Sequence, residues 1–284
     1  MAGRSFWKGS ISFGLVNIPV KLYTTIDSSK DFSFNQLDNK GHRIQQKRWC
    51  PVEDKEIPYS EIKKGYQVSN DKYIVIEKED LDKIKLKTTQ NIDIKEFIDS
   101  KHFDPLLIEK SYYVAPEKKK KNGTIDKAYL LFAKVINETN KIAIGKVVLK
   151  DREHLVALRV YQRGIVMHQL HYIDEIKPVD EIDEMSEVAA AATVAPNSSA
   201  SSQPTIDSKE ISLGKTLVEN LTSKEFDISQ YSDEYTKQLE QLINAKASGK
   251  KTLHAEPAQI EDDTSKNLLE ALKASVQQKG KPKH

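Results

Sequence analysis

The chain has 284 residues and a mass of 32.2 kDa, of which 38% are hydrophobic and 30% charged, so part of its length is expected to lie outside a folded core. The net charge of +2 is unevenly distributed along the chain: residues 1–172 carry 31 Lys and Arg against 22 Asp and Glu, whereas residues 173–284 carry 13 against 20. This asymmetry indicates a polyanionic partner for the first part of the chain and a protein partner or regulatory role for the second. From this sequence we expect no membrane helix, no signal peptide and no internal disulfide, and the single Cys50 fits a reducing cytoplasm.

The first predicted element is a pair of strands at the N-terminus. Over residues 10–15, small or polar residues alternate with Ile11, Phe13 and Leu15, and this period of two places the three side chains on one buried face. Pro19 indicates either an edge position or an interruption of strand pairing.

From residue 32 to 172 the pattern is mostly that of short strands separated by turn residues, which favours a barrel or sandwich over alternating β-α units. Residues 150–154 predict a hairpin, the apolar spacing over 127–135 predicts a helix, and Glu79 and Asp80 predict the start of a short helical turn. The predicted strands are 73–77, 84–88, 92–97, 106–114, 142–149, 155–161 and 165–170.

Residues 40–49 form a basic cluster, with four cations and no acidic residue. If the segment is extended, Arg43 and Lys47 share one face and Lys40 and Arg48 share the other, so that a hairpin presents charge on two sides. Such side chains suit contact with the phosphate backbone of a nucleic acid, and contacts of this kind do not depend on the nucleotide sequence. A solvated hairpin is the alternative interpretation.

Two further lysine runs are weaker signals. Lys63 and Lys64 repeat the basic pattern on a smaller scale, whereas the four lysines at 118–121 are interpreted as a charged loop tip.

The clearest domain boundary follows the predicted strands. Residues 174–187 contain seven acidic residues and one lysine, and the Ala, Ser and Pro-rich run 188–204 is typical of a flexible linker. We therefore divide the chain into a core of residues 1–177, a linker of 178–205, a helical segment of 206–250, and a tail of 251–284 with a short helix and a basic end.

Two helices are predicted in the segment 206–250. The first begins at a cap formed by Asp207 or Ser208, and the second ends at Gly249. The apolar face of the first is formed by Ile211, Leu217, Val218 and Leu221, and that of the second by Tyr231, Tyr235, Leu239, Leu242 and Ile243.

No residue pattern supports catalysis, a metal site or a cofactor. The run Gly214-Lys-Thr216 resembles the end of a phosphate-binding loop, but Lys209 stands where that loop requires glycine. His168 and His171 have no further ligands at metal-binding spacing, and no Ser-His-Asp or Cys-His arrangement is recognisable. We expect a protein that is not an enzyme.

Several runs along the chain, in order, resemble prokaryotic Ku, the DNA-end-binding protein of bacterial non-homologous end joining. The most specific is Trp7-Lys-Gly-Ser-Ile-Ser-Phe-Gly-Leu-Val-Asn-Ile-Pro-Val20. The others are Cys50-Pro-Val, Ile62-Lys-Lys-Gly-Tyr66, Asn91-Ile-Asp-Ile with Phe97, Asp104-Pro, Ser111-Tyr-Tyr-Val-Ala-Pro116, Lys127-Ala-Tyr-Leu-Leu, Ile142-Ala-Ile-Gly-Lys-Val-Val-Leu149, and the stretch from Phe226 and Tyr231-Ser-Asp-Glu-Tyr235 to Gly249. The resemblance covers roughly residues 4–177 and 206–250. The lysine run 118–121 and the linker 188–204 depart from the family pattern.

The resemblance implies a mainly β fold with α-helices: a Ku-type β-barrel core and a DNA-encircling arm, followed by the C-terminal helical segment. Two copies form a homodimeric ring through which the end of a DNA duplex is threaded. We place the arm at about residues 28–66. The predicted DNA-binding residues of the arm are Lys40, Arg43, Lys47, Arg48, Lys63 and Lys64, and those of the barrel are Lys110, Lys150, Arg152 and Arg159.

The resemblance also implies a protein partner and a location. The C-terminal segment of the family recruits an ATP-dependent end-joining DNA ligase, and the acidic balance of this segment suits a basic protein face. The predicted partner-binding residues are Tyr231, Tyr235, Leu239 and Leu242. The expected location is the cytoplasm, in association with the nucleoid.

Two alternatives belong to other functional classes. A basic β-barrel module that binds single-stranded nucleic acid or RNA requires aromatic residues along one strand face, for which Tyr112, Tyr113 and Phe103 are the candidates. A protein-only scaffold uses the linker and helices but leaves the basic first part unexplained.

Overall fold

A computed structural model describes residues 4–27, 31–70, 72–84, 90–117, 124–185, 188, 206–248 and 273. The chain divides into two compact units, residues 1–178 and 179–284, which are described separately. The lysine run 118–121, Gly249, nearly all of the linker 188–204 and nearly all of the tail 251–284 lie outside the described residues.

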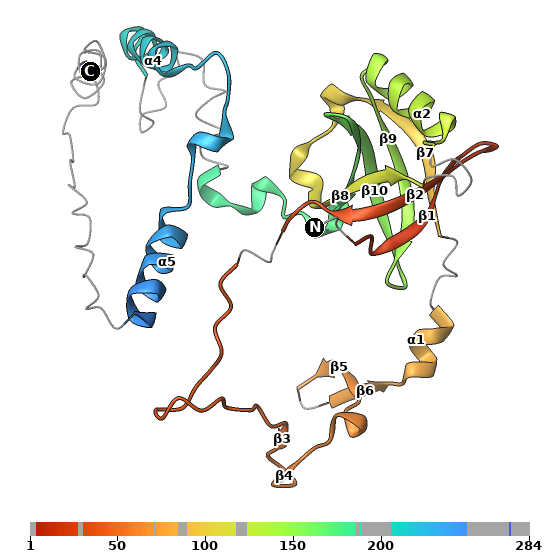
Figure 1. Ribbon diagram of the computed structural model, residues 1–284, viewed down its shortest axis with the longest axis vertical. Coiled ribbons are helices and arrows are strands. Elements are labelled where there is room, and N and C mark those ends of the chain that lie inside the picture. Colours follow the sequence, from red (N-terminus) through yellow and green to blue (C-terminus); the bar gives the residue numbers. More distant parts are fainter. Residues whose placement is uncertain are drawn as a thin grey trace. The chain divides into compact units, whose positions relative to one another are not determined.

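The first unit is built on a closed barrel of seven strands, and this confirms the expected mixed β and α fold (Figure 1). Around the barrel, β1 is followed by β2, β8, β11, β10, β9 and β7, and β7 closes the barrel through a parallel pairing with β1. All other neighbouring strands of the barrel are antiparallel. The strands are β1 (Trp7–Phe13), β2 (Val16–Thr24), β7 (Asn91–Asp99), β8 (Ile108–Pro116), β9 (Lys141–Leu149), β10 (Arg152–Tyr161) and β11 (Gly164–Leu170).

The barrel interior is the main core of the molecule. Alternate residues of each strand point inward because side chains of a strand alternate between its two faces. The side chains that are almost completely buried are Ile11, Ile18, Val20, Leu22, Ile92, Val114, Val147, Val156, Leu158, Ile165 and Met167. On the outside of β9, β10 and β11 a second, smaller cluster forms around Ile142, Ala157 and Leu170.

Helix α2 (Lys127–Glu138) completes the core, as predicted for residues 127–135. The Asp126 carboxylate caps it by accepting the Ala128 N–H at 2.9 Å. The helix buries Tyr129, Phe132 and Ile136 in the same cluster as the inward-facing barrel residues. The Tyr129 hydroxyl donates to the Val114 carbonyl at 2.7 Å and accepts the Ile165 N–H at 3.1 Å, so its polar atom is fully used.

In the N-terminal strand pair, Leu15 departs from its expected burial, and the strand pairing shows how Pro19 is accommodated. Leu15 was expected on the buried face but is fully exposed, because the chain turns at Gly14, which has a φ of 56°. Pro19 pairs with Ser10 of β1 but lies beyond the β8 pairing, which begins at Val20, so its missing N–H interrupts no hydrogen bond to β8.

The segment between β2 and β7, residues 25–90, lies outside the barrel strands, and we call it the insertion. It contains β3 (Trp49–Cys50) paired with β4 (Lys55–Glu56), β5 (Lys64–Ser69) paired with β6 (Lys72–Ile76), and α1 (Lys78–Ile84). The helical turn predicted at residues 79–80 is confirmed. The strand predicted from Ile84 is wrong at its start, because Ile84 ends α1, and residues 85–89 lie outside the described range.

The described part of the second unit contains two capped helices, as predicted. Asp207 and Glu210 form a capping box at the start of α4 (Ser208–Leu221), and Asp233 caps α5 (Glu234–Ala247). Tyr231 was expected on the face of the second helix but precedes it, in the stretch where its ring contacts Phe226. Neither helix has a buried residue.

Candidate nucleic-acid interface

The basic cluster of the insertion begins in a turn. The Asp38 carboxylate accepts the backbone N–H groups of Lys40 and His42, and hydrogen bonds from His42 are the main reason that the pKa of Asp38 lies below its usual value. Arg43 forms an isolated bridge with Leu37. The segment is therefore not one extended strand, and the expected two-faced alternation of its cations does not hold for Lys40.

Three of the ten predicted DNA-binding residues already pair with carboxylates. Lys47 lies 2.7 Å from Glu56, Lys63 lies 2.6 Å from Glu77, and Lys110 lies 3.0 Å from Glu109. In each case the hydrogen bond to the glutamate, followed by its charge, raises the lysine pKa. A phosphate has to displace the glutamate, although an exposed pair of this kind is worth only about 0–1 kcal/mol.

The other predicted DNA-binding cations of the insertion form no ion pair with a carboxylate among the described residues. The Arg48 guanidinium lies over the Tyr59 ring, 5.0 Å from its centroid, and the Arg48 carbonyl accepts the Ile57 N–H at 2.8 Å. Lys64 is the first residue of β5 and is exposed. Arg43 donates to the side-chain oxygen of Asn35. These three side chains keep their charge available for a polyanion.

The structure spreads the four barrel candidates along the barrel and does not gather them at one place. The predicted hairpin is confirmed: Lys150 and Asp151 form its two-residue turn with φ angles of 50° and 69°, and Leu149 pairs with Arg152. Arg159 lies about 23 Å further along β10, at about 3.3 Å per residue, and on the opposite face of the strand from Arg152. Lys110 pairs with Gln169, which pairs with Val156, so Lys110 is level with the middle of β10 rather than with either end.

Arg159 is fixed by a histidine that the sequence did not mark as functional. Its Nε–H donates to His168 Nε2 at 2.9 Å, and His168 Nδ1 lies 2.8 Å from Ser111 Oγ. Because Nε2 accepts, the ring proton is on Nδ1 and donates to the serine. His168 is 4% exposed and its ring stacks on Phe103, with centroids 6.2 Å apart. Burial, and then the charge of Arg159, lower the pKa of His168 to about 4.

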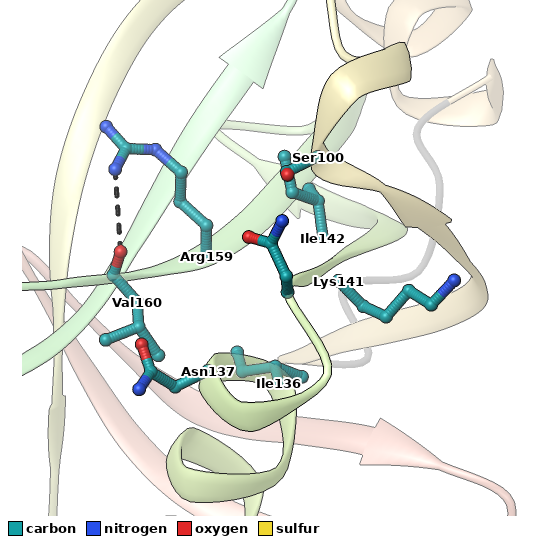
Figure 2. Close-up of a pocket in the computed structure, with 8 residues that line it drawn as sticks. Ser100, Ile136, Asn137, Lys141, Ile142, Arg159 and Val160 are labelled. Atoms are coloured by element: carbon teal, nitrogen blue, oxygen red, sulfur yellow. Dashed lines mark hydrogen bonds between the residues drawn. The ribbon is translucent and has the colours of Figure 1, made fainter.

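Arg159 also borders an open hollow of about 200 Å³ between the C-terminal turn of α2, the start of β9, the end of β10 and the turn after β7 (Figure 2). Its polar lining residues are Ser100, Asn137, Asn140, Lys141 and Arg159, and its apolar ones are Ile136, Ile142 and Val160. Lys141 is held by Asp99 at 2.6 Å, and this contact lowers the pKa of Asp99. No carboxylate lines the hollow.

The aromatic residues considered for base stacking do not share a face. Tyr112 and Tyr113 are consecutive in β8 and point to opposite sides, and Tyr112 packs against the barrel core. Phe103 packs against the second apolar cluster and His168. These three residues therefore do not form the stacking surface that the single-strand or RNA-binding alternative expects of them.

Within the described ranges, no group of three His, Cys, Asp or Glu residues has the arrangement of a metal site, and no helix is long and apolar enough to cross a membrane. Cys50 is a free thiol. Lys215 lies inside helix α4, which agrees with the rejection of a phosphate-binding loop at this position.

The predicted partner-binding residues lie at or near α5. Tyr235, Leu239 and Leu242 have the helical spacing of one face, and Tyr235 and Leu242 are 72% and 38% exposed. Tyr231 is 73% exposed. The structure thus presents an apolar stripe in which Leu239 is half-buried and the other predicted residues are exposed.

Comparison with known proteins gives consistent matches. The family described as "Ku70/Ku80 beta-barrel domain" matches residues 12–213. Proteins named "Non-homologous end joining protein Ku" include one from Archaeoglobus fulgidus, 38% identical over 96% of this chain and 98% of the relative, and one from Heliobacterium modesticaldum, 34% identical over 98% and 93%. A relative of the same name from Bacillus subtilis is 33% identical over 98% of this chain and 83% of its own length.

Proposed function

The chain belongs to the Ku family, and from this premise we propose that it is a homodimeric ring that binds the ends of double-stranded DNA without sequence specificity and serves non-homologous end joining. The resemblance found in the sequence is confirmed by the family match and by the near full-length relatives. Those relatives are named for end joining and for no reaction, and we propose a binding role, at the nucleoid, rather than catalysis.

The observation that carries the proposal is the insertion. None of its described residues is buried, although it contains many large apolar side chains and two small two-stranded sheets. An isolated two-stranded ribbon is marginally stable in water at best. In the ribbon β5–β6, apolar side chains are exposed on both faces: Tyr66 (67%), Tyr73 (61%), Ile74 (53%) and Val75 (49%).

A second copy of the chain supplies what the insertion lacks. In a two-fold symmetric dimer the same apolar surface is buried twice, so each insertion gains a partner and the two close a ring. The unpaired cations Lys40, Arg43, Arg48 and Lys64 then serve as the first phosphate contacts, because backbone contact needs charge and no groove-reading helix.

Dimerisation is tested by the molar mass in solution. We expect a dimer for the native chain and a shift toward monomer for the double variant Tyr66→Ser and Tyr73→Ser. Tyr113→Ser, at a half-exposed tyrosine of the barrel, is the matched control and leaves the dimer intact. A native chain that is monomeric at micromolar concentration contradicts the ring.

End recognition is tested by comparing one duplex sequence in an open linear form and in a form closed by hairpins at both ends, at fixed salt. A protein that threads onto DNA binds the open form and loses most of its binding to the closed one. Equal binding to both forms shows contact from the side and overturns the ring.

We further propose that the second unit recruits the ATP-dependent ligase through the apolar stripe of α5. The double variant Tyr235→Ser and Leu242→Ser is expected to bind DNA ends normally but to lose stimulation of ligation. Asn244→Ser, on the opposite side of the helix, is the control. A chain ending at residue 200 that still stimulates the ligase as well as the full chain rules out this role.

A further inference from the structure

We propose that the hollow beside α2 is a seat for one phosphate group of the bound DNA, with Arg159 as its cationic contact and His168 as the residue that positions Arg159. This inference rests on the proposed DNA-binding function and assigns it a site on the barrel. It also separates Arg159 from Arg152 and Lys150, with which the sequence pattern groups it.

The first argument is the chemistry of the lining. Arg159, Asn137, Asn140 and Ser100 supply guanidinium, amide and hydroxyl donors, and Figure 2 shows Arg159, Asn137 and Ser100 on different sides of the hollow. No hydrogen bond among the described residues uses the side-chain donors of Asn137, Asn140 or Ser100. Donors that have no internal acceptor fit an anionic oxygen ligand.

The second argument is the charge balance around the hollow. The cation Lys141 is already compensated by Asp99, whereas Arg159 is in none of the ion pairs of the described residues. Its Nε–H is taken by His168, and one terminal nitrogen reaches the Val160 carbonyl at 3.5 Å, the limit of a hydrogen bond. The remaining terminal N–H groups are free to meet two oxygens of one phosphate.

The third argument is the way in which Arg159 is held. A long arginine side chain loses rotamer freedom when it binds, and fixing it beforehand reduces that cost. The His168 ring fixes Arg159 through an uncharged acceptor. A carboxylate in its place would fix Arg159 too, but it would also neutralise the guanidinium. The low pKa of His168 keeps the ring uncharged at neutral pH, and Ser111 holds its other nitrogen.

The test is the salt dependence of binding to an open linear duplex, measured with the full chain. Arg159→Gln is expected to reduce the slope of log affinity against log salt by about 0.9 for each phosphate that is no longer neutralised. Arg163→Gln removes the same charge four residues away, in the exposed turn outside the hollow, and is expected to change the slope less. Equal slopes for Arg159→Gln and the native chain overturn the proposal.

The positioning role of His168 is tested by two substitutions. His168→Gln keeps an acceptor for Arg159 and is expected to retain the native slope, whereas His168→Met removes the acceptor and is expected to behave as Arg159→Gln does. In the double variant of His168→Met with Arg159→Gln, the two effects on affinity are not additive, because both remove the same interaction. Full additivity overturns the positioning role.

The lining is tested at an exposed position, where folding is not at risk. Asn137→Asp places a carboxylate at the hollow and is expected to weaken DNA binding by several-fold. Asn17→Asp, at an exposed position of β2, makes the same charge change elsewhere on the barrel. Equal weakening by both variants shows a general charge effect and overturns the site.

Two further arms identify the source of the phosphate. If 5′-phosphorylated and 5′-hydroxyl duplexes lose equal affinity through Arg159→Gln, the seat takes a backbone phosphate, as proposed. If inorganic phosphate raises the melting temperature of the native chain but not of Arg159→Gln, while DNA binding is unchanged, the site takes free phosphate and its assignment to DNA is wrong. Failure of any of these tests leaves the end-binding comparison of open and closed duplexes untouched.

Discussion

The barrel and the insertion belong to the same unit of the chain but are stabilised in different ways. The barrel has a continuous interior of almost completely buried aliphatic side chains, closed by α2. The insertion also contains many large aliphatic and aromatic side chains, yet none of its described residues is buried. The comparison indicates that the buried core lies in the barrel, whereas the insertion presents the exposed apolar side chains for which we propose a second copy as the partner.

The largest expected effect tests whether stability resides in the barrel. Phe132 is 4% exposed and contacts the Phe13 ring with centroids 5.2 Å apart. Phe132→Ala is expected to lower the free energy of unfolding by about 3–5 kcal/mol, because it removes buried area and leaves a cavity.

Urea denaturation at low protein concentration measures this effect. Tyr73→Ala in the insertion is the matched comparison and is expected to change the free energy of unfolding by less than about 0.5 kcal/mol, as an exposed substitution does. Similar losses for the two variants contradict the assignment of stability to the barrel.

A second test measures how the free energy of unfolding depends on pH. It concerns the barrel alone, because the buried His168 lies in β11. The pKa of His168 is about 4 in the folded chain and about 6.5 when unfolded. Between these values the unfolded chain binds a proton that the folded chain does not, so stability is complete above pH 6.5 and falls as the pH drops toward 4.

The difference corresponds to about 3 kcal/mol at roughly 1.4 kcal/mol per pKa unit. Comparing the pH dependence of unfolding for the native chain with that of His168→Gln isolates this contribution from that of the carboxylates, because glutamine does not titrate. Parallel curves for the two proteins show that His168 ionises freely and that its contact with Arg159 is weaker than described.

The smallest expected effect concerns the insertion, where cations divide into paired and unpaired ones. Glu77→Gln removes the carboxylate that pairs with Lys63 and is expected to cost less than about 1 kcal/mol of stability. If Lys63 contacts DNA, the same change strengthens binding at low salt, and the gain disappears at high salt. Weaker binding of Glu77→Gln instead shows that the pair positions Lys63 for its contact.

Sequence patterns predicted the parts of the molecule that depend on local chemistry. Asp207 as a cap and the hairpin around Lys150 follow from short runs of residues, and both are confirmed. Leu15 departs from the alternation rule because Gly14 begins the turn one residue earlier than the pattern suggests.

The contact between Arg159 and His168 could not be predicted in this way. It depends on the pairing register of β10 with β11, in which Arg159 lies opposite Val166, and on the burial of the ring by Phe103. Neither has a local signature in the sequence. The same holds for the hollow, whose lining comes from α2, β9, β10 and the turn after β7.

The parallel pairing of β1 with β7 has a consequence for the length of the insertion. Because β2 and β7 lie on either side of β1, the barrel closes a chain loop that runs from Thr24 to Asn91. The entropy cost of closing a flexible loop grows only with the logarithm of its length, so doubling the loop adds about 0.6 kcal/mol. The barrel can therefore carry insertions of very different sizes at almost constant stability, and the span available to enclose a ligand can change without any alteration of the core.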